Sequence, residues 1–170
     1  MTLADCDLAE VAEQLLAETR ATYPGRHVDL AVRGSVRGYF DGDRVAQAMA
    51  NLIANAITYS AVSEPVTVEL EELRSEVAVT VTNRGPAIPP EVLPMLFKPF
   101  QRGPSPVSDR DTTRSVGLGL YIVERIVQGH RGRIEVVSQD GLTRFRMLLP
   151  RRPSSGRMRA LSQSNLPSLG

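Results

Sequence analysis

The sequence contains a single cysteine, only two histidines and no long apolar run. The lone Cys6 excludes an internal disulfide, and we expect a small packing residue at the edge of a helix, in a reducing compartment. No apolar stretch approaches the ~20 residues of a membrane span, and the first residues lack a signal-peptide pattern. A net charge of +1 gives no global polarity toward nucleic acid. We therefore expect a cytoplasmic protein that contacts neither nucleic acid nor a membrane directly.

The composition predicts one domain followed by a tail. With 42% hydrophobic residues among 170, the chain can bury one sizeable core. The hydrophobic patterns lie within residues 1–150, which we assign to this domain. Residues 151–170 are rich in Ser, Pro and Arg and have few apolar side chains, so we expect this tail to be disordered.

Hydrophobic periodicity predicts an α/β fold. Helical spacing marks residues 7–20, a helix capped by Asp43, and residues 118–128, while strand patterns mark residues 27–32, 36–40, 66–73, 77–82, 133–138 and 143–149. The last two strands turn at Asp140 and Gly141. We expect a two-layer α/β sandwich, with three main helices on one face of a mixed, mostly antiparallel sheet of about five strands.

A glycine-containing segment leads into the last predicted helix. Residues 115–121 read Ser-Val-Gly-Leu-Gly-Leu-Tyr and continue directly into the apolar period of residues 122–127. Two glycines at the start of a helix let backbone amides approach a phosphate, and the helix dipole adds partial positive charge. Glycines also occur at tight helix starts for packing reasons, so this segment alone leaves both interpretations open.

Two asparagines, Asn51 and Asn55, lie one turn apart beside the buried face of the second predicted helix. Asparagine is a mediocre helix former, so a stripe that met only water would favour other residues. An amide oxygen is a hard neutral ligand, suited to a magnesium ion that bridges nucleotide phosphates. The alternative is that both amides bind water or cap a neighbouring loop.

A third polar position, Asn83, follows the alternating strand of residues 77–82 and leads into a turn that contains Gly85 and Pro86. Leu93, Leu96 and Phe97 come next at helical spacing. The polar run at residues 104–114 has the composition of a mobile loop or lid.

The order of these segments resembles the catalytic ATP-binding domain of sensor histidine kinases, within the wider group of the heat-shock-protein, gyrase and MutL ATPases. Residues 51–60 resemble the asparagine box of this family, and residues 96–102 its phenylalanine box. Residues 83–89 and 116–121 resemble its two glycine boxes. The resemblance runs from about residue 8 to about residue 150. The box that begins at Asn83 is also similar to that of some soluble sensor kinases, bacterial phytochromes among them.

The resemblance implies that ATP and Mg²⁺ are the cofactors. It makes Asn55, helped by Asn51, the magnesium ligand and the catalytic pair. The implied nucleotide-binding residues are Tyr59, Asn83, Gly85, Ile88, Phe100, Arg102, Gly117, Leu118, Gly119, Leu120 and Thr143. Among them Tyr59 lies against the adenine, Asn83 accepts from its exocyclic amine, and Thr143 lies at the back of the base pocket. Phe97, Phe100 and Arg102 anchor the lid.

Three positions depart from the family pattern. Asn83 stands where the family usually has aspartate, and a neutral acceptor costs on the order of 1 kcal/mol of affinity. We therefore expect Asn83→Asp to strengthen ATP binding. Ala87 replaces a common second glycine, and Thr58 replaces a lysine that reaches the phosphates. These departures allow either a working but weaker kinase or a degenerate domain, and the intact asparagines and Gly-Leu-Gly-Leu segment favour the first.

In this family the γ-phosphoryl group passes to a histidine on a separate dimerisation domain of the same kinase, with a response regulator downstream. Neither His27 nor His130 lies in a sequence like that acceptor motif, so we interpret both as structural. His130 follows a helix end, where a cation is favoured. Two alternatives stay open: a non-catalytic regulatory module, and an anti-sigma-type serine kinase of the same fold, against which the phenylalanine box argues.

Overall fold

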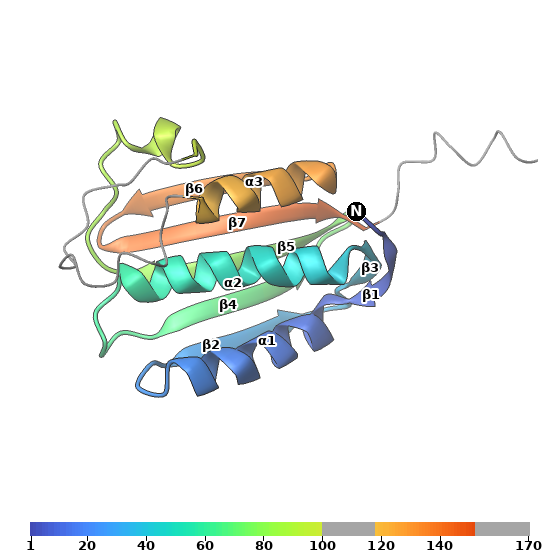
Figure 1. The fold of residues 1–170 in the computed structure, drawn as a ribbon, viewed down its shortest axis with the longest axis horizontal. Coiled ribbons are helices and arrows are strands. Elements are labelled where there is room, and N and C mark those ends of the chain that lie inside the picture. The colour runs from blue at the N-terminus through green and yellow to red at the C-terminus, as the bar shows by residue number, and fades with distance from the viewer. Residues whose placement is uncertain (100–117, 152–170) are drawn as a thin grey trace, which may run out of the picture.

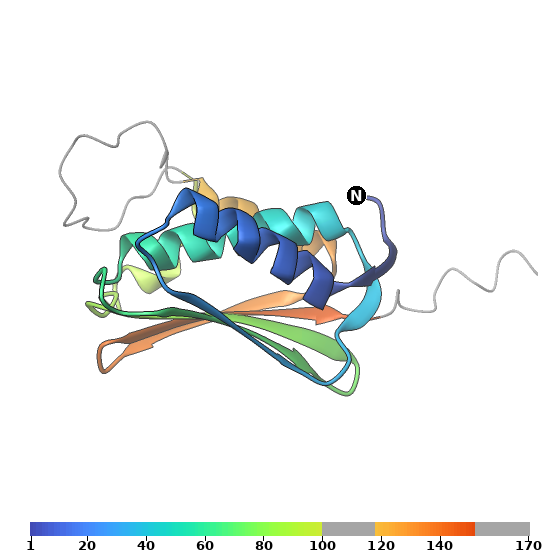
Figure 2. The same cartoon turned by 90° about the horizontal axis from the view of Figure 1, so that it is seen from below.

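The computed structural model describes residues 1–99 and 118–151. Three helices cover one face of a five-stranded sheet with the order β2-β4-β5-β7-β6 (Figures 1 and 2). β2 and β4 are parallel, and the other neighbouring strands of this sheet are antiparallel. The elements are β1 Ala4–Asp7, α1 Leu8–Thr22, β2 Val28–Arg33, β3 Arg37–Phe40, α2 Gly42–Thr58, β4 Val66–Glu72, β5 Glu76–Arg84, the 3-10 turn Leu93–Met95, α3 Gly119–Gly129, β6 Arg133–Gln139 and β7 Leu142–Pro150. The predicted two-layer sandwich is confirmed.

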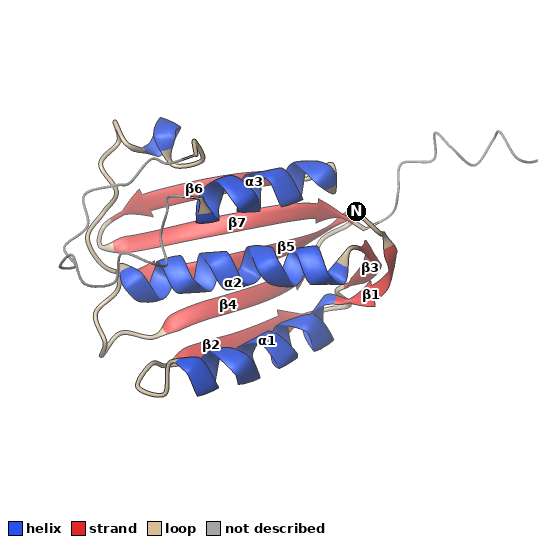
Figure 3. Ribbon diagram, viewed as in Figure 1, coloured by secondary structure: helices blue, strands red, loops and turns tan. Residues whose placement is uncertain are grey.

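Figure 3 colours the helices and the strands differently and shows them overlapping, and the view turned by 90° in Figure 2 shows the helices on one side of the sheet. The core lies between the helices and the sheet and consists of apolar side chains at the expected period of each element. Within the described ranges, none of the helices combines the length and the apolar character that crossing a bilayer requires.

The central helix α2 begins at a different aspartate from the predicted one. Asp41 is the N-cap: its backbone is extended and its Oδ1 accepts the Arg44 amide at 3.2 Å. Asp43, the predicted cap, lies in the first turn, so that prediction was wrong. The apolar period begins at Val45 and fits either cap. Asp41 Oδ2 also accepts the Thr2 amide, and these bonds, the Thr2 contact first, lower the pKa of Asp41.

Cys6 lies in a strand, which corrects the expectation of a helix edge. β1 pairs antiparallel with β3, with Cys6 opposite Gly38, in a two-stranded ribbon separate from the main sheet. Burial first, then the neighbouring Asp7 and Asp5, raises the pKa of the Cys6 thiol. The thiol therefore stays protonated and packs against the core as a small apolar group.

His130 joins the end of α3 to the beginning of α2. The residue is buried, its Nδ1 lies 2.9 Å from the Ile126 carbonyl oxygen, and its Nε2 accepts the Asp41 amide at 3.0 Å. A carbonyl only accepts, so Nδ1 carries the hydrogen and the imidazole is neutral. The placement fits a structural role but not the cation that the helix end suggested.

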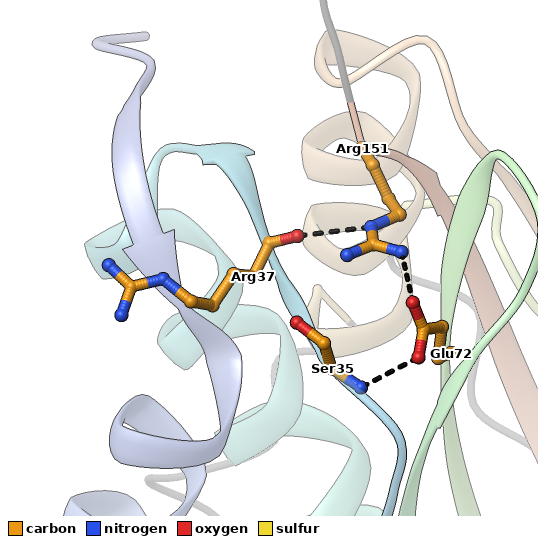
Figure 4. Close-up of polar contacts among 4 residues, drawn as sticks. All are labelled: Ser35, Arg37, Glu72 and Arg151. Carbon is orange, nitrogen blue, oxygen red and sulfur yellow. Dashed lines mark hydrogen bonds and ion pairs between the residues drawn. The ribbon is translucent and has the colours of Figure 1, made fainter.

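A cluster of polar contacts around Glu72 and Arg151 joins the ends of three strands (Figure 4). Arg151 Nη1 donates to Glu72 Oε1 at 2.7 Å and its Nε donates to the Arg37 carbonyl at 3.1 Å. The other Glu72 oxygen accepts the Ser35 amide at 2.8 Å, and the Arg151 carbonyl accepts the Tyr39 amide at 3.0 Å. These bonds tie the ends of β7, β4 and β3 together at the first residue of the predicted tail. The rest of that tail lies outside the described residues.

We predict that Glu72→Gln lowers stability at neutral pH and flattens the acid dependence of unfolding. The Ser35 amide, and then Arg151, hold the pKa of Glu72 below its ordinary value of 4.5. A carboxylate with a lowered folded-state pKa stabilises the fold above pH 4.5, and that stability is lost as the pH falls through the lowered pKa. Urea unfolding of both proteins between pH 3 and pH 7 measures the difference.

The matched control is Glu69→Gln on the same strand. Glu69 pairs with Arg33 at 3.7 Å, and both side chains are exposed. Such a pair contributes little. If the free energy of unfolding of Glu72→Gln depended on pH as it does in the native protein, protonation of the Glu72 carboxylate would not be coupled to the stability of the cluster.

Candidate functional site

Four chain segments meet at one end of the sandwich, on the left in Figure 1: the second half of α2, the start of α3, the end of β5 and the start of β7. Asn51 Nδ2 donates to the Gly119 carbonyl at 3.3 Å, which joins the asparagine-bearing helix to the start of α3. The structure therefore brings together the two segments that the sequence analysis assigned to magnesium and phosphate.

The two asparagines of α2 keep oxygen atoms available for a ligand. Asn51 uses its Nδ2 in the bond to Gly119, and its Oδ1 has no hydrogen-bond partner among the described residues. The Asn55 side chain forms no hydrogen bond to a described residue, while its backbone carbonyl accepts the Tyr59 amide at the helix end. Thr58 donates its hydroxyl to the Ala54 carbonyl of the same helix and brings no charge to this end of the molecule.

Two neutral amide oxygens one turn apart suit Mg²⁺, which binds hard oxygen ligands and keeps several waters. Within the described part of the chain, no three His, Cys, Asp or Glu residues gather as a metal-binding group. An ion held by Asn51 and Asn55 would thus take its remaining ligands from phosphate oxygens and water. The donor chemistry fits a nucleotide-bound magnesium ion.

The start of α3 offers backbone donors to an anion. Leu118 occupies the N-cap position, and no side chain of the described residues caps the helix or accepts from the amides of its first turn. Gly119 is exposed and Leu120 packs against the core. The segment thus combines open amides with an anchored helix.

The predicted residues Phe100, Arg102 and Gly117 lie outside the described residues. Phe97, the earlier aromatic residue of the same box, packs edge to face on Phe145, with ring centroids 6.3 Å apart. The chain that leads toward the predicted lid is therefore anchored on the core.

A polar row crosses the end of the sheet on its helix-facing side. Asn83 of β5 is opposite Thr143 of β7, which is opposite Ser138 of β6. Two residues further along the strands, the same face carries the apolar Val81, Phe145 and Val136. Because alternate residues of a strand share a face, this row is where the core gives way to a polar surface.

Ser138 is a member of this row that the sequence analysis missed. Its Oγ accepts the Ile88 amide at 2.8 Å and lies 2.8 Å from Thr143 Oγ1. Ile88 packs against the core, so Ser138 ties the loop after β5 to the polar row of the sheet. The sequence signal that could have identified Ser138 is its position, because this polar residue follows Ile134 and Val136 at the two-residue spacing of a strand.

Asn83 lies within β5, since the strand continues through Arg84 rather than ending at Thr82 as predicted. The residue is 4% exposed, and its amide forms no hydrogen bond to a described residue. In the described part of the chain, Arg26 Nε is the one fully buried side-chain polar atom without a hydrogen-bond partner. Asn83 is therefore a buried polar side chain at the end of β5 whose amide no described residue binds.

Gly85 lets the end of β5 approach the end of α2. Its amide donates to the Gly141 carbonyl at 3.0 Å, and a Cβ at this position would lie 2.2 Å from the Tyr59 carbonyl oxygen. Asp140 and Gly141 both have positive φ, 54° and 72°, as a two-residue hairpin turn of type I′ requires. The end of β5, the end of α2 and the β6–β7 hairpin thus pack closely through their backbones at this end of the sandwich.

The comparisons with known proteins agree with this geometry. Residues 40–153 match the family described as histidine kinase-, DNA gyrase B-, and HSP90-like ATPase. The chain belongs to this ATPase family. The resemblance to the ATP-binding domain of sensor kinases is thereby confirmed.

Among its relatives is a bacteriophytochrome of Pseudomonas aeruginosa, 35% identical over 146 residues that cover 86% of this chain and 20% of the relative. The sensor protein VanSC of Enterococcus gallinarum is 35% identical over 147 residues, 85% of this chain and 40% of the relative. The chain thus spans between a fifth and two fifths of these relatives. The structure of the mycobacterial sensor histidine kinase MprB matches with a TM-score of 0.75 at 25% identity, over 89% of this chain and 99% of that one.

We predict that Gly85→Ala destabilises the domain by about 1–3 kcal/mol, because the new methyl group would force β5 away from the Tyr59 carbonyl. Urea unfolding measures the loss. Gly25→Ala is the control, since a Cβ there meets nothing within 4 Å. Equal stability of the two variants would contradict the close approach at Gly85.

Proposed function

We propose that this chain is the ATP-binding catalytic domain of a two-component sensor histidine kinase, acting in the cytoplasm. It would donate the γ-phosphoryl group of ATP to a histidine on a separate dimerisation domain of the same kinase. The single observation that carries the proposal is the Asn51–Gly119 contact, which sets one amide side chain beside the start of α3, with Asn55 one turn further along α2. Membership of the ATPase family and the sensor-kinase relatives support it.

The proposed mechanism is positioning and charge neutralisation, with no covalent intermediate on this domain. The amides at the start of α3 would bind the phosphates, and Asn83 and Thr143 would orient the base. Asn55 and Asn51 would hold Mg²⁺, which supplies neutralisation of the phosphate charge. The chain's Tyr59 and Ile88 would flank the base and keep water from it.

The acceptor would come from another domain. Both ring nitrogens of His130 are occupied by the Ile126 carbonyl and the Asp41 amide, so phosphorylation there would break the junction of α2 and α3. We therefore propose two partners, the dimerisation domain as phosphoryl acceptor and a response regulator downstream.

The second candidate is a degenerate, non-catalytic module of the same fold. The neutral Asn83 and the Thr58 hydroxyl, turned back onto its own helix, favour it. ATP titration by calorimetry, with and without Mg²⁺, separates the two: no magnesium-dependent binding at millimolar nucleotide would leave only the degenerate module. Labelled ATP with the parent dimerisation domain then tests transfer, since phosphohistidine is acid-labile and the phosphoserine of an anti-sigma-type kinase is acid-stable.

We predict that Asn55→Ala weakens magnesium-dependent ATP binding by at least about tenfold, the loss of one good ligand contact. The fold should be unaffected, because the Asn55 side chain contacts no described residue through a hydrogen bond. Calorimetry gives the affinity and thermal unfolding the stability. Gln47→Ala, on an exposed position of the same helix, should leave both unchanged. Undiminished affinity in Asn55→Ala would remove this residue from the metal site.

A further inference from the structure

Asn83 is a nearly buried side chain whose amide nothing in the described structure orients. The residue is 4% exposed and forms no side-chain hydrogen bond to a described residue. Gly85 borders the Asn83 amide on one side, since a Cβ placed on Gly85 would lie 3.7 Å from Asn83 Nδ2. Glycine has no side chain, so it offers the amide no polar side-chain atom on that side. The carbonyl and the NH₂ of Asn83 can therefore exchange places by a half turn of the amide plane.

The second polar group of the row, the Thr143 hydroxyl, can likewise act as a hydrogen-bond donor or as an acceptor. Ser138 Oγ accepts the Ile88 amide, which occupies one lone pair and leaves its hydrogen and its second lone pair. The hydrogen between Ser138 Oγ and Thr143 Oγ1, 2.8 Å apart, can then belong to either oxygen. Thr143 presents a donor to the pocket in one case and an acceptor in the other. The Ile88 amide can only donate, and its hydrogen is already bound to Ser138 Oγ.

Purines differ at this edge in the sense of their hydrogen bonds. Adenine presents a donor at its 6-amino group and an acceptor at N1, whereas a 6-oxopurine presents an acceptor at O6 and a donor at N1. A carboxylate only accepts, so it pairs with the first pattern and leaves O6 without a donor. An amide that can turn pairs with both patterns, donating to one position and accepting from the other.

We infer that Asn83 relaxes the base selectivity of this site, so that it accepts 6-oxopurine nucleoside triphosphates as well as ATP. The inference rests on the proposed function, because both require a purine nucleotide at this end of the sandwich. The inference adds to the proposed function that the chain recognises the base by its shape and its apolar contacts rather than by a fixed pattern of hydrogen-bond donors and acceptors.

The test compares Mg²⁺-ATP with Mg²⁺-ITP by calorimetry, because the two bases differ only in the 6-substituent and the N1 hydrogen that goes with it. The native chain should bind ITP within about tenfold of ATP. Asn83→Asp should bind ATP more tightly and ITP more weakly, which widens the ratio to about a hundredfold or more. Gln139→Glu makes the same amide-to-carboxylate change at an exposed position one residue beyond Ser138, and should keep the native ratio.

The outcomes separate this inference from the proposed function. ATP binding with an ITP affinity more than about a hundredfold weaker in the native chain would overturn the inference and leave the proposed function standing. Binding of neither nucleotide would overturn the proposed function itself. Equal ratios in the native chain and Asn83→Asp would show that Asn83 does not set selectivity. Thermal unfolding checks each variant, and if Asn83→Asp does not fold, the ratio of the native chain alone decides.

Discussion

The hydrogen bond from Asn51 to the Gly119 carbonyl is the contact on which the site depends. It joins α2 to the start of α3, two helices that both rest on the same face of the sheet. A shift of either helix would break this bond between the asparagine-bearing helix and the first turn of α3. The same bond constrains Asn51 itself, since its Nδ2 is used in packing and only its Oδ1 remains for a ligand. Structure and binding therefore share one side chain.

Periodicity was enough to predict the three helices and the strands β2 to β7, and not enough for β1. α2, α3 and the strands β4 to β7 each bury a regular stripe, and the Asp140–Gly141 turn follows from two residues that tolerate positive φ. β1 has only four residues, Ala-Asp-Cys-Asp, and its pairing with β3 is a long-range contact that no local pattern encodes. The start of α2 was misplaced by two residues because Asp41 and Asp43 both fit a cap, and only the backbone conformation distinguishes them.

The site was predicted mainly through the resemblance, and the structure adds what spacing cannot give. The order of the boxes pointed to Asn51, Gly119, Asn83 and Thr143, and these residues do lie at one end of the fold. Ser138 was missed because its importance comes from Ile88, fifty positions away in sequence and brought to it by the loop after β5. The role of Gly85 likewise appears only when the Tyr59 carbonyl is seen beside it.

The contact cluster around Arg151 has a consequence for how the domain can be driven. It fastens the last described residue to β3, at the end of the sandwich where the first residues also lie and opposite to the end where β5 ends and β7 starts (Figure 1). A force applied through these two points would act at the opposite end of the sandwich from Asn83 and Thr143. Such a force would reorient the sandwich as a whole and would not act directly on the polar row of the sheet.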